Sequence, residues 1–267
     1  MSDQALFEAI LVELAIVRNR MDYLKDAVLI GGQVLAIEQM AAGAPAVFQV
    51  ETDTGQRIQR PFSMEPDLLV DPPSIEESAL WDQLPITLRE CGFRRTGRAF
   101  KWAKALAGGV MELDLFMPLG HVEPVTQMTP VEDGHRILDR AREVVVPVQG
   151  RELRIKLPHP ADFLRMKLDN FDRTDAIRLE QHKAKDALDI YGYIHLKTPA
   201  LIAAALRDPR DESIVGRLRE HFGSERSPGV QRVLKLLPGY SPEDRAMVAK
   251  HVVRTVSAVI GSAINFR

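Results

Sequence analysis

The sequence changes its pattern near residue 157, and this change constrains the fold more than any other feature. Before it, short apolar runs typical of strands alternate with amphipathic segments typical of helices. After it, helical spacing dominates, and successive helices are separated by prolines, namely Pro199, Pro209, Pro228, Pro238 and Pro242. The sequence therefore predicts an α+β protein. A mixed-sheet core with flanking helices would occupy residues 1–157, and an all-helical region would follow at 158–267.

One junction in the first half connects a strand directly to a helix. The apolar run Val28–Ile30 stops at Gly31-Gly32, and an amphipathic segment then continues to about Met40. We expect a helix from about Gly32, whose first N–H groups are unpaired and carry the positive end of the helix dipole. A phosphate could bind there. Two glycines at such a junction also serve tight packing, so both interpretations stay open.

Acidic residues follow in two pairs. Glu65 and Asp67 open one apolar run, and Glu112 and Asp114 lie in another. Acids two residues apart in a strand point to the same face. If the two strands are neighbours, Glu65, Asp67 and Asp114 would converge, and a half-buried carboxylate cluster needs a cation. Mg²⁺ prefers carboxylate, water and phosphate oxygens. The alternative is that these acids face solvent or pair with an arginine such as Arg60.

In order and spacing, Gly31-Gly32, Glu65-Pro-Asp67 and Glu112-Leu-Asp114 resemble the nucleotidyltransferase superfamily that includes DNA polymerase β. The resemblance implies that Gly31 and Gly32 cradle the triphosphate of an NTP, and that Glu65 and Asp67 hold Mg²⁺. Asp114 would be the third carboxylate and would activate the acceptor hydroxyl. Glu112 competes with Asp114 for this role, but Asp114 opens the more apolar Leu-Phe end. Pro66 and the glutamate at the first acidic position depart from the family pattern.

Two segments of the second half extend the resemblance. Pro160–Leu168 and His182–Ile190 are similar to the end of the AbiEii-type toxin nucleotidyltransferases, where a lysine and a Lys-Asp-x-x-Asp run face the nucleotide. By this resemblance Lys167 contacts phosphate, and Asp189, or Asp186, completes the site.

The residues alone also allow a structural role for these aspartates. Asp186 and Asp189 are three residues apart and would share one helix face. Lys183 and Lys185 on the same helix could balance their charge.

Composition limits the functions that need to be considered. Hydrophobic residues make up 45% and charged residues 27% of the chain, as in ordinary globular proteins, and the net charge of −2 argues against indiscriminate polyanion binding. The single cysteine, Cys91, excludes an intrachain disulfide. The first residues lack the basic region of a signal peptide, and no run approaches the ~18 apolar residues of a membrane span. We therefore expect a cytoplasmic protein.

Two functional hypotheses follow. The first is a Mg²⁺-dependent nucleotidyltransferase, which transfers a nucleoside monophosphate from an NTP to a hydroxyl of RNA, protein or a small molecule. RNA would fit a toxin of a toxin–antitoxin pair. The second is a nucleotidyltransferase-like module that has lost catalysis and serves binding or regulation. A cation-rich segment, Phe93–Lys104, could guide RNA to such a site or form a solvated hairpin.

Overall fold

The structure is a computed structural model, and it describes residues 2–21, 24–46, 48–52, 55–60, 63–71, 78–97, 101–119, 128–173, 180–237 and 239–265. Its contacts divide the chain into two compact units. The first comprises Met1–Val47 and Pro61–His159, and the second comprises Phe48–Arg60 and Pro160–Arg267. The predicted α+β class with a mixed sheet is confirmed.

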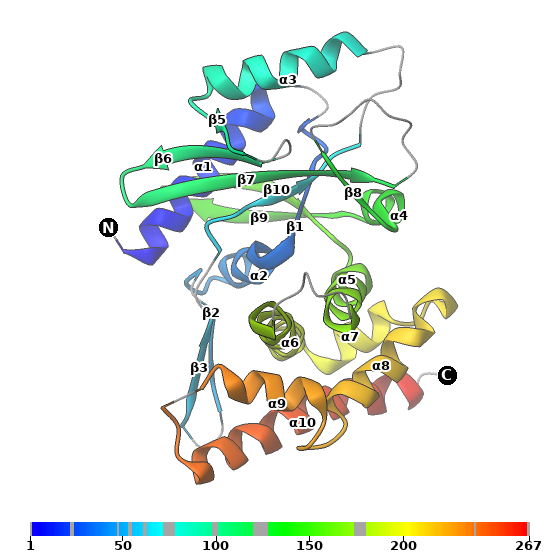
Figure 1. Cartoon of the computed structure of the whole chain (residues 1–267). Coiled ribbons are helices and arrows are strands. Elements are labelled where there is room, and N and C mark those ends of the chain that lie inside the picture. The colour runs from blue at the N-terminus through cyan, green and yellow to red at the C-terminus, as the bar shows by residue number, and fades with distance from the viewer. Residues whose placement is uncertain are drawn as a thin grey trace. The chain divides into compact units, whose positions relative to one another are not determined.

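The first unit is built on a mixed sheet (Figure 1). Its described strands are β1 (Val28–Ile30), β4 (Asp67–Leu69), β5 (Arg94–Arg95), β6 (Lys101–Leu106), β7 (Gly109–Pro118), β8 (Thr129–Val131), β9 (Arg142–Val148) and β10 (Arg151–Leu157). They follow the order β5-β6-β7-β4-β1-β10-β9, with β8 beside β7. β7 is parallel to β4 and β8, and β1 is parallel to β10, whereas the other pairs are antiparallel.

Four α-helices and a 3₁₀ turn accompany the described part of this sheet. They are α1 (Asp3–Arg20), η2 (Gly31–Gln33), α2 (Val34–Ala41), α3 (Ser78–Glu90) and α4 (Gly134–Asp139). In Figure 1, α1 runs across the strands, and it contacts α3 and β9.

The two faces of the sheet differ in polarity because side chains alternate along each strand. Leu29 and Leu68 are cross-strand partners, and both border a small gap that is also lined by Leu11 and Leu14 of α1. This face is therefore the apolar one, packed against α1. Residues of the opposite parity, including Asp67, point to the other face.

Some short elements were not expected from the sequence. The strand β7 continues to Pro118, and the three-residue strand β8 pairs with its last residues. The six-residue helix α4 was not predicted either. It starts after Asp133, which has a positive φ of 56° and makes no side-chain cap hydrogen bond, and its six residues are too few to show a helical repeat in the sequence. The helix α3 is described only from Ser78, because residues 72–77 lie outside the described part.

The second unit combines helices with a small hairpin. Its elements are β2 (Phe48–Glu51), β3 (Arg57–Arg60), α5 (Pro160–Asp172), α6 (Glu180–Leu196), α7 (Pro199–Ala205), η4 (Pro209–Asp211), α8 (Glu212–Phe222), α9 (Pro228–Lys235) and α10 (Pro242–Asn265). The hairpin is attached to α10 and the segment before it. Gln56 donates from Nε2 to Asp244 Oδ1 at 2.8 Å, and the hydroxyl of Tyr240 donates to the carbonyl of Arg57.

The helix α10 packs against α6, α7, α8 and α9. Among the described residues it is the one helix whose length and composition reach those of a membrane span, with a mean hydropathy of 1.3. Within that window 44% of the residues are buried, among them Val248, Val252, Val256 and Val259. This spacing is that of an apolar stripe facing a protein core.

Candidate functional site

The strand β1 ends beside the carboxylate of Asp67. Gly31 follows β1 directly and has a φ of +77°, a conformation that favours glycine. A Cβ atom on Gly31 would lie 1.8 Å from Asp67 Oδ2, so no larger residue fits without displacing that carboxylate. The chain then makes the 3₁₀ turn η2 before α2 begins at Val34. The α-helix predicted from Gly32 therefore starts two residues later.

The strand register places Asp67 and Asp114 side by side. Asp67 of β4 is the cross-strand partner of Ile30 on one side and of Asp114 on the other. Asp114 is in turn the partner of Lys101 in β6. Directly opposite residues point to the same face, so this row of side chains lies on one face of the sheet. The structure thus brings together Gly31, Asp67 and Asp114.

Glu65 lies just before β4, on the same side as Asp67. The backbone N–H of Glu65 donates to the hydroxyl of Ser63 at 3.1 Å, and its side chain is 55% exposed. Gln33, a fully buried residue of η2, donates from Nε2 to the carbonyl of Ser63 at 2.8 Å. Gln33 therefore ties the glycine turn to the segment that carries Glu65, a link that the sequence analysis missed.

Lys101 occupies the centre of the acidic side chains. Its ammonium lies 2.6 Å from Glu112 Oε2 and 3.8 Å from both Glu65 Oε2 and Asp114 Oδ2. Burial lowers the pKa of Lys101, but the hydrogen bond to Glu112 and the charges of Asp114 and Glu65 raise it. The net pKa lies above the ordinary lysine value. The ammonium is therefore charged at neutral pH and balances part of the acidic charge.

The sequence contained a signal for this placement. The turn between β6 and β7 lies between Leu106 and Gly109, which are cross-strand partners. Moving five residues away from the turn along each strand pairs Lys101 with Asp114. In the sequence, Lys101 was interpreted only as one cation of the segment Phe93–Lys104, which could guide RNA or form a solvated hairpin. This interpretation therefore did not place Lys101 opposite Asp114.

The donor chemistry of this face suits a divalent cation. Asp67 and Asp114 supply carboxylate oxygens in register, and the missing side chain of Gly31 leaves room against Asp67. Within the described ranges, however, no group of three or more acidic, histidine or cysteine side chains is already arranged to hold a metal ion. The carboxylates of Glu65 and Asp114 are shared with Lys101 instead.

The second unit holds its own buried charge cluster. Lys167 of α5 lies 2.7 Å from Asp189 Oδ2 and 3.3 Å from Asp186 Oδ1 of α6. All three side chains are almost fully buried, with Lys167 6% exposed. The two aspartates thus share the charge of a lysine on the neighbouring helix, whereas Lys185 of their own helix is exposed. Binding of phosphate by Lys167 stays a prediction.

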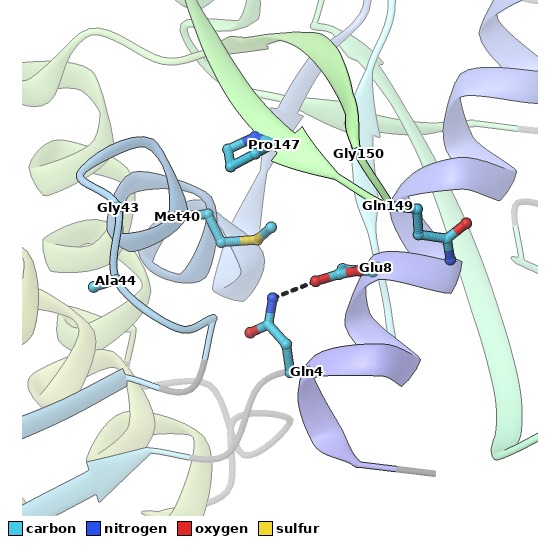
Figure 2. Close-up of a pocket in the computed structure, with 8 residues that line it drawn as sticks. All are labelled: Gln4, Glu8, Met40, Gly43, Ala44, Pro147, Gln149 and Gly150. Atoms are coloured by element: carbon cyan, nitrogen blue, oxygen red, sulfur yellow. Dashed lines mark hydrogen bonds between the residues drawn. The ribbon is translucent and has the colours of Figure 1, made fainter.

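A separate hollow of about 380 Å³ lies in the first unit (Figure 2). Its described lining residues are Gln4, Glu8, Met40, Gly43, Ala44, Pro147, Gln149 and Gly150. Gln4 donates from Nε2 to Glu8 at 2.7 Å, as the dashed line in Figure 2 shows. These lining residues include no lysine or arginine, so the hollow lacks the cations that would favour a polyphosphate.

No protein-family model and no curated protein matches this chain. The resemblance to nucleotidyltransferases therefore rests on the residues themselves, and family membership stays a prediction.

Proposed function

We propose that this chain is a Mg²⁺-dependent nucleotidyltransferase acting on an NTP in the cytoplasm. The observation that carries the proposal is the in-register pair Asp67 and Asp114, placed beside the glycine turn at Gly31. This is the arrangement that the sequence motifs imply for the superfamily. It brings two carboxylates from separate strands to one point of the sheet.

The roles of the residues follow from their chemistry. The backbone N–H groups at Gly31 and Gly32 would bind the triphosphate, and Glu65, Asp67 and Asp114 would hold Mg²⁺. When bound, Mg²⁺ supplies charge stabilisation for the transferring phosphoryl group. Asp114 would accept the proton of the acceptor hydroxyl. The new bond joins the acceptor oxygen to the α-phosphorus, and the bond to pyrophosphate breaks.

The position of Lys101 favours a second candidate. An ammonium 2.6 Å from Glu112 and 3.8 Å from Asp114 can stabilise these acids without a metal. A chain that had lost catalysis could keep such a face and serve as a binding or regulatory module.

Transfer of labelled nucleotide separates the two candidates. The protein is incubated with Mg²⁺, each of the four α-labelled NTPs, and total cellular RNA or protein. Pyrophosphate release in an undialysed cell extract is measured alongside, to detect transfer to a small molecule. An active transferase labels an acceptor or releases pyrophosphate, and Asp67→Asn reduces both by orders of magnitude because it removes a charge from the metal ligands.

Asp71→Asn is the matched control, since Asp71 is an exposed acid four residues further along the same segment. It should retain wild-type transfer. If the wild type gives neither label nor pyrophosphate but binds NTP, the module is the correct interpretation.

A further inference from the structure

Lys101 is held inside the acidic face by the hairpin that carries it. The register of β6 and β7 pairs it with Asp114, and its side chain reaches diagonally to Glu112, two residues before Asp114. The side chain is only 18% exposed. Its place among the acids is therefore fixed by the strand pairing and not by chance contact of a long surface side chain.

Several carboxylates surround Lys101. Glu65, Glu112 and Asp114 all approach its ammonium within 4 Å, and Asp67 lies on the same face beside Asp114. The ammonium of Lys101 therefore lies within ion-pair distance of three carboxylates. A divalent cation bound by Glu65 and Asp114 would use the same oxygens that now face the ammonium.

We propose that Lys101 is an internal counter-cation that competes with divalent metal for Glu65 and Asp114. The proposal rests on the metal-dependent function proposed above and adds a residue that tunes its metal affinity. In the metal-free protein Lys101 keeps the clustered acids compatible with the fold. When a divalent cation binds, the ammonium must give up Glu65 and Asp114 and keeps Glu112, its nearest partner.

The competition has a measurable size. Charges of +1 and +2 about 4 Å apart repel enough, even at the dielectric constant of water, to weaken an affinity by roughly thirtyfold. Removal of the ammonium should therefore tighten binding of a divalent cation by about tenfold or more. Substitution of a lysine that lies away from this acidic face would not tighten metal binding.

The same strand offers a matched control. Lys104 is also part of β6 but has the opposite parity, and its ammonium contacts Glu13 of α1 at 2.5 Å. Its side chain is 20% exposed, almost the same as that of Lys101. Lys104→Met thus removes a similar half-buried ion pair from the other face of the sheet.

The experiment is a titration with Mn²⁺, which replaces Mg²⁺ and is detected by electron paramagnetic resonance, on wild type, Lys101→Met and Lys104→Met. We expect tighter Mn²⁺ binding by about tenfold or more in Lys101→Met and wild-type affinity in Lys104→Met. The melting temperature of Lys101→Met should also rise more with Mn²⁺ than that of wild type, because the metal replaces the missing charge.

Each other outcome is decisive. If wild type binds Mn²⁺ and Lys101→Met binds it equally or more weakly, Lys101 does not compete, and the proposed function is unaffected. If neither protein binds Mn²⁺, the metal-dependent function itself is wrong, and the inference falls with it. Should Lys101→Met fail to fold even with Mn²⁺, Lys101→Gln, which retains a polar end, is titrated and interpreted in the same way.

Discussion

Replacing Gly31 with alanine tests the close approach of the glycine turn to Asp67. Two costs add. An alanine held at a φ of +77° costs roughly 1–2 kcal/mol. The new Cβ would also lie 1.8 Å from Asp67 Oδ2, and displacing a packed group in this way costs about 1–3 kcal/mol. Gly31→Ala should therefore lower the free energy of unfolding of the first unit by about 2–5 kcal/mol.

Gly150→Ala separates the two costs. Gly150 has nearly the same φ, +74°, but a Cβ there would meet no atom within 4 Å. This control should lose only the roughly 1–2 kcal/mol of backbone strain. The difference between the two variants then measures the contact with Asp67.

Urea unfolding followed by tryptophan fluorescence is a suitable assay. Trp81 and Trp102 are the two tryptophans of the chain, and both belong to the first unit. Combining Gly31→Ala with Asp67→Ala should recover about 1–3 kcal/mol, because the displaced carboxylate is gone. Equal losses in Gly31→Ala and Gly150→Ala would refute the contact, and with it the placement of Asp67 beside the turn.

Two further predictions concern the second unit. Lys167→Met should lower the free energy of unfolding by about 3–5 kcal/mol, because it removes the positive charge beside two buried aspartates. Urea unfolding followed by circular dichroism measures this loss, and Lys185→Met, at an exposed position, is the control that should cost little. An equally small loss in both variants would favour a phosphate-binding Lys167. Partial desolvation of the His195 ring and the neighbouring His251, at 5.5 Å between ring centroids, lower the pKa of His195. As the pH falls, His195 is therefore protonated in the unfolded chain before it is protonated in the folded protein. Its contribution to the free energy of unfolding should be complete above about pH 6.5 and decline below it. Melting temperatures between pH 8 and 5 should show a shallower decline in His195→Gln, and an unchanged slope would contradict this role.

The sequence predicts which side chains share a face of a strand better than it predicts which strands are neighbours in the sheet. The spacing of the acids correctly predicts that Glu112 and Asp114 share one face, because both carboxylates approach the ammonium of Lys101 within 4 Å. Nothing local specifies that β4 pairs in parallel with β7 and antiparallel with β1, since these pairings join distant segments. The convergence of the acids was therefore conditional until the sheet order was known.

The buried Lys167 shows a second limit of prediction from the sequence. Sequence spacing identified Asp186 and Asp189 as one helix face, which is confirmed by their burial. It offered Lys183 and Lys185 as partners because only neighbours on the same helix are visible in a sequence. The structure instead pairs the aspartates with Lys167, since the packing of α5 against α6 decides which cation is buried with them.

The small hairpin β2–β3 has a consequence for biosynthesis. Its contacts with the α10 region join residues 183 and 188 positions apart in the chain. At about 5–20 residues per second, a ribosome would make the hairpin roughly 10–40 seconds before Tyr240 and Asp244 exist. An isolated two-stranded hairpin is barely stable in water. This segment therefore stays without its α10 contacts while the strands before and after it in the chain are made. The helix α10 therefore completes a unit whose first strands, β2 and β3, were made long before it.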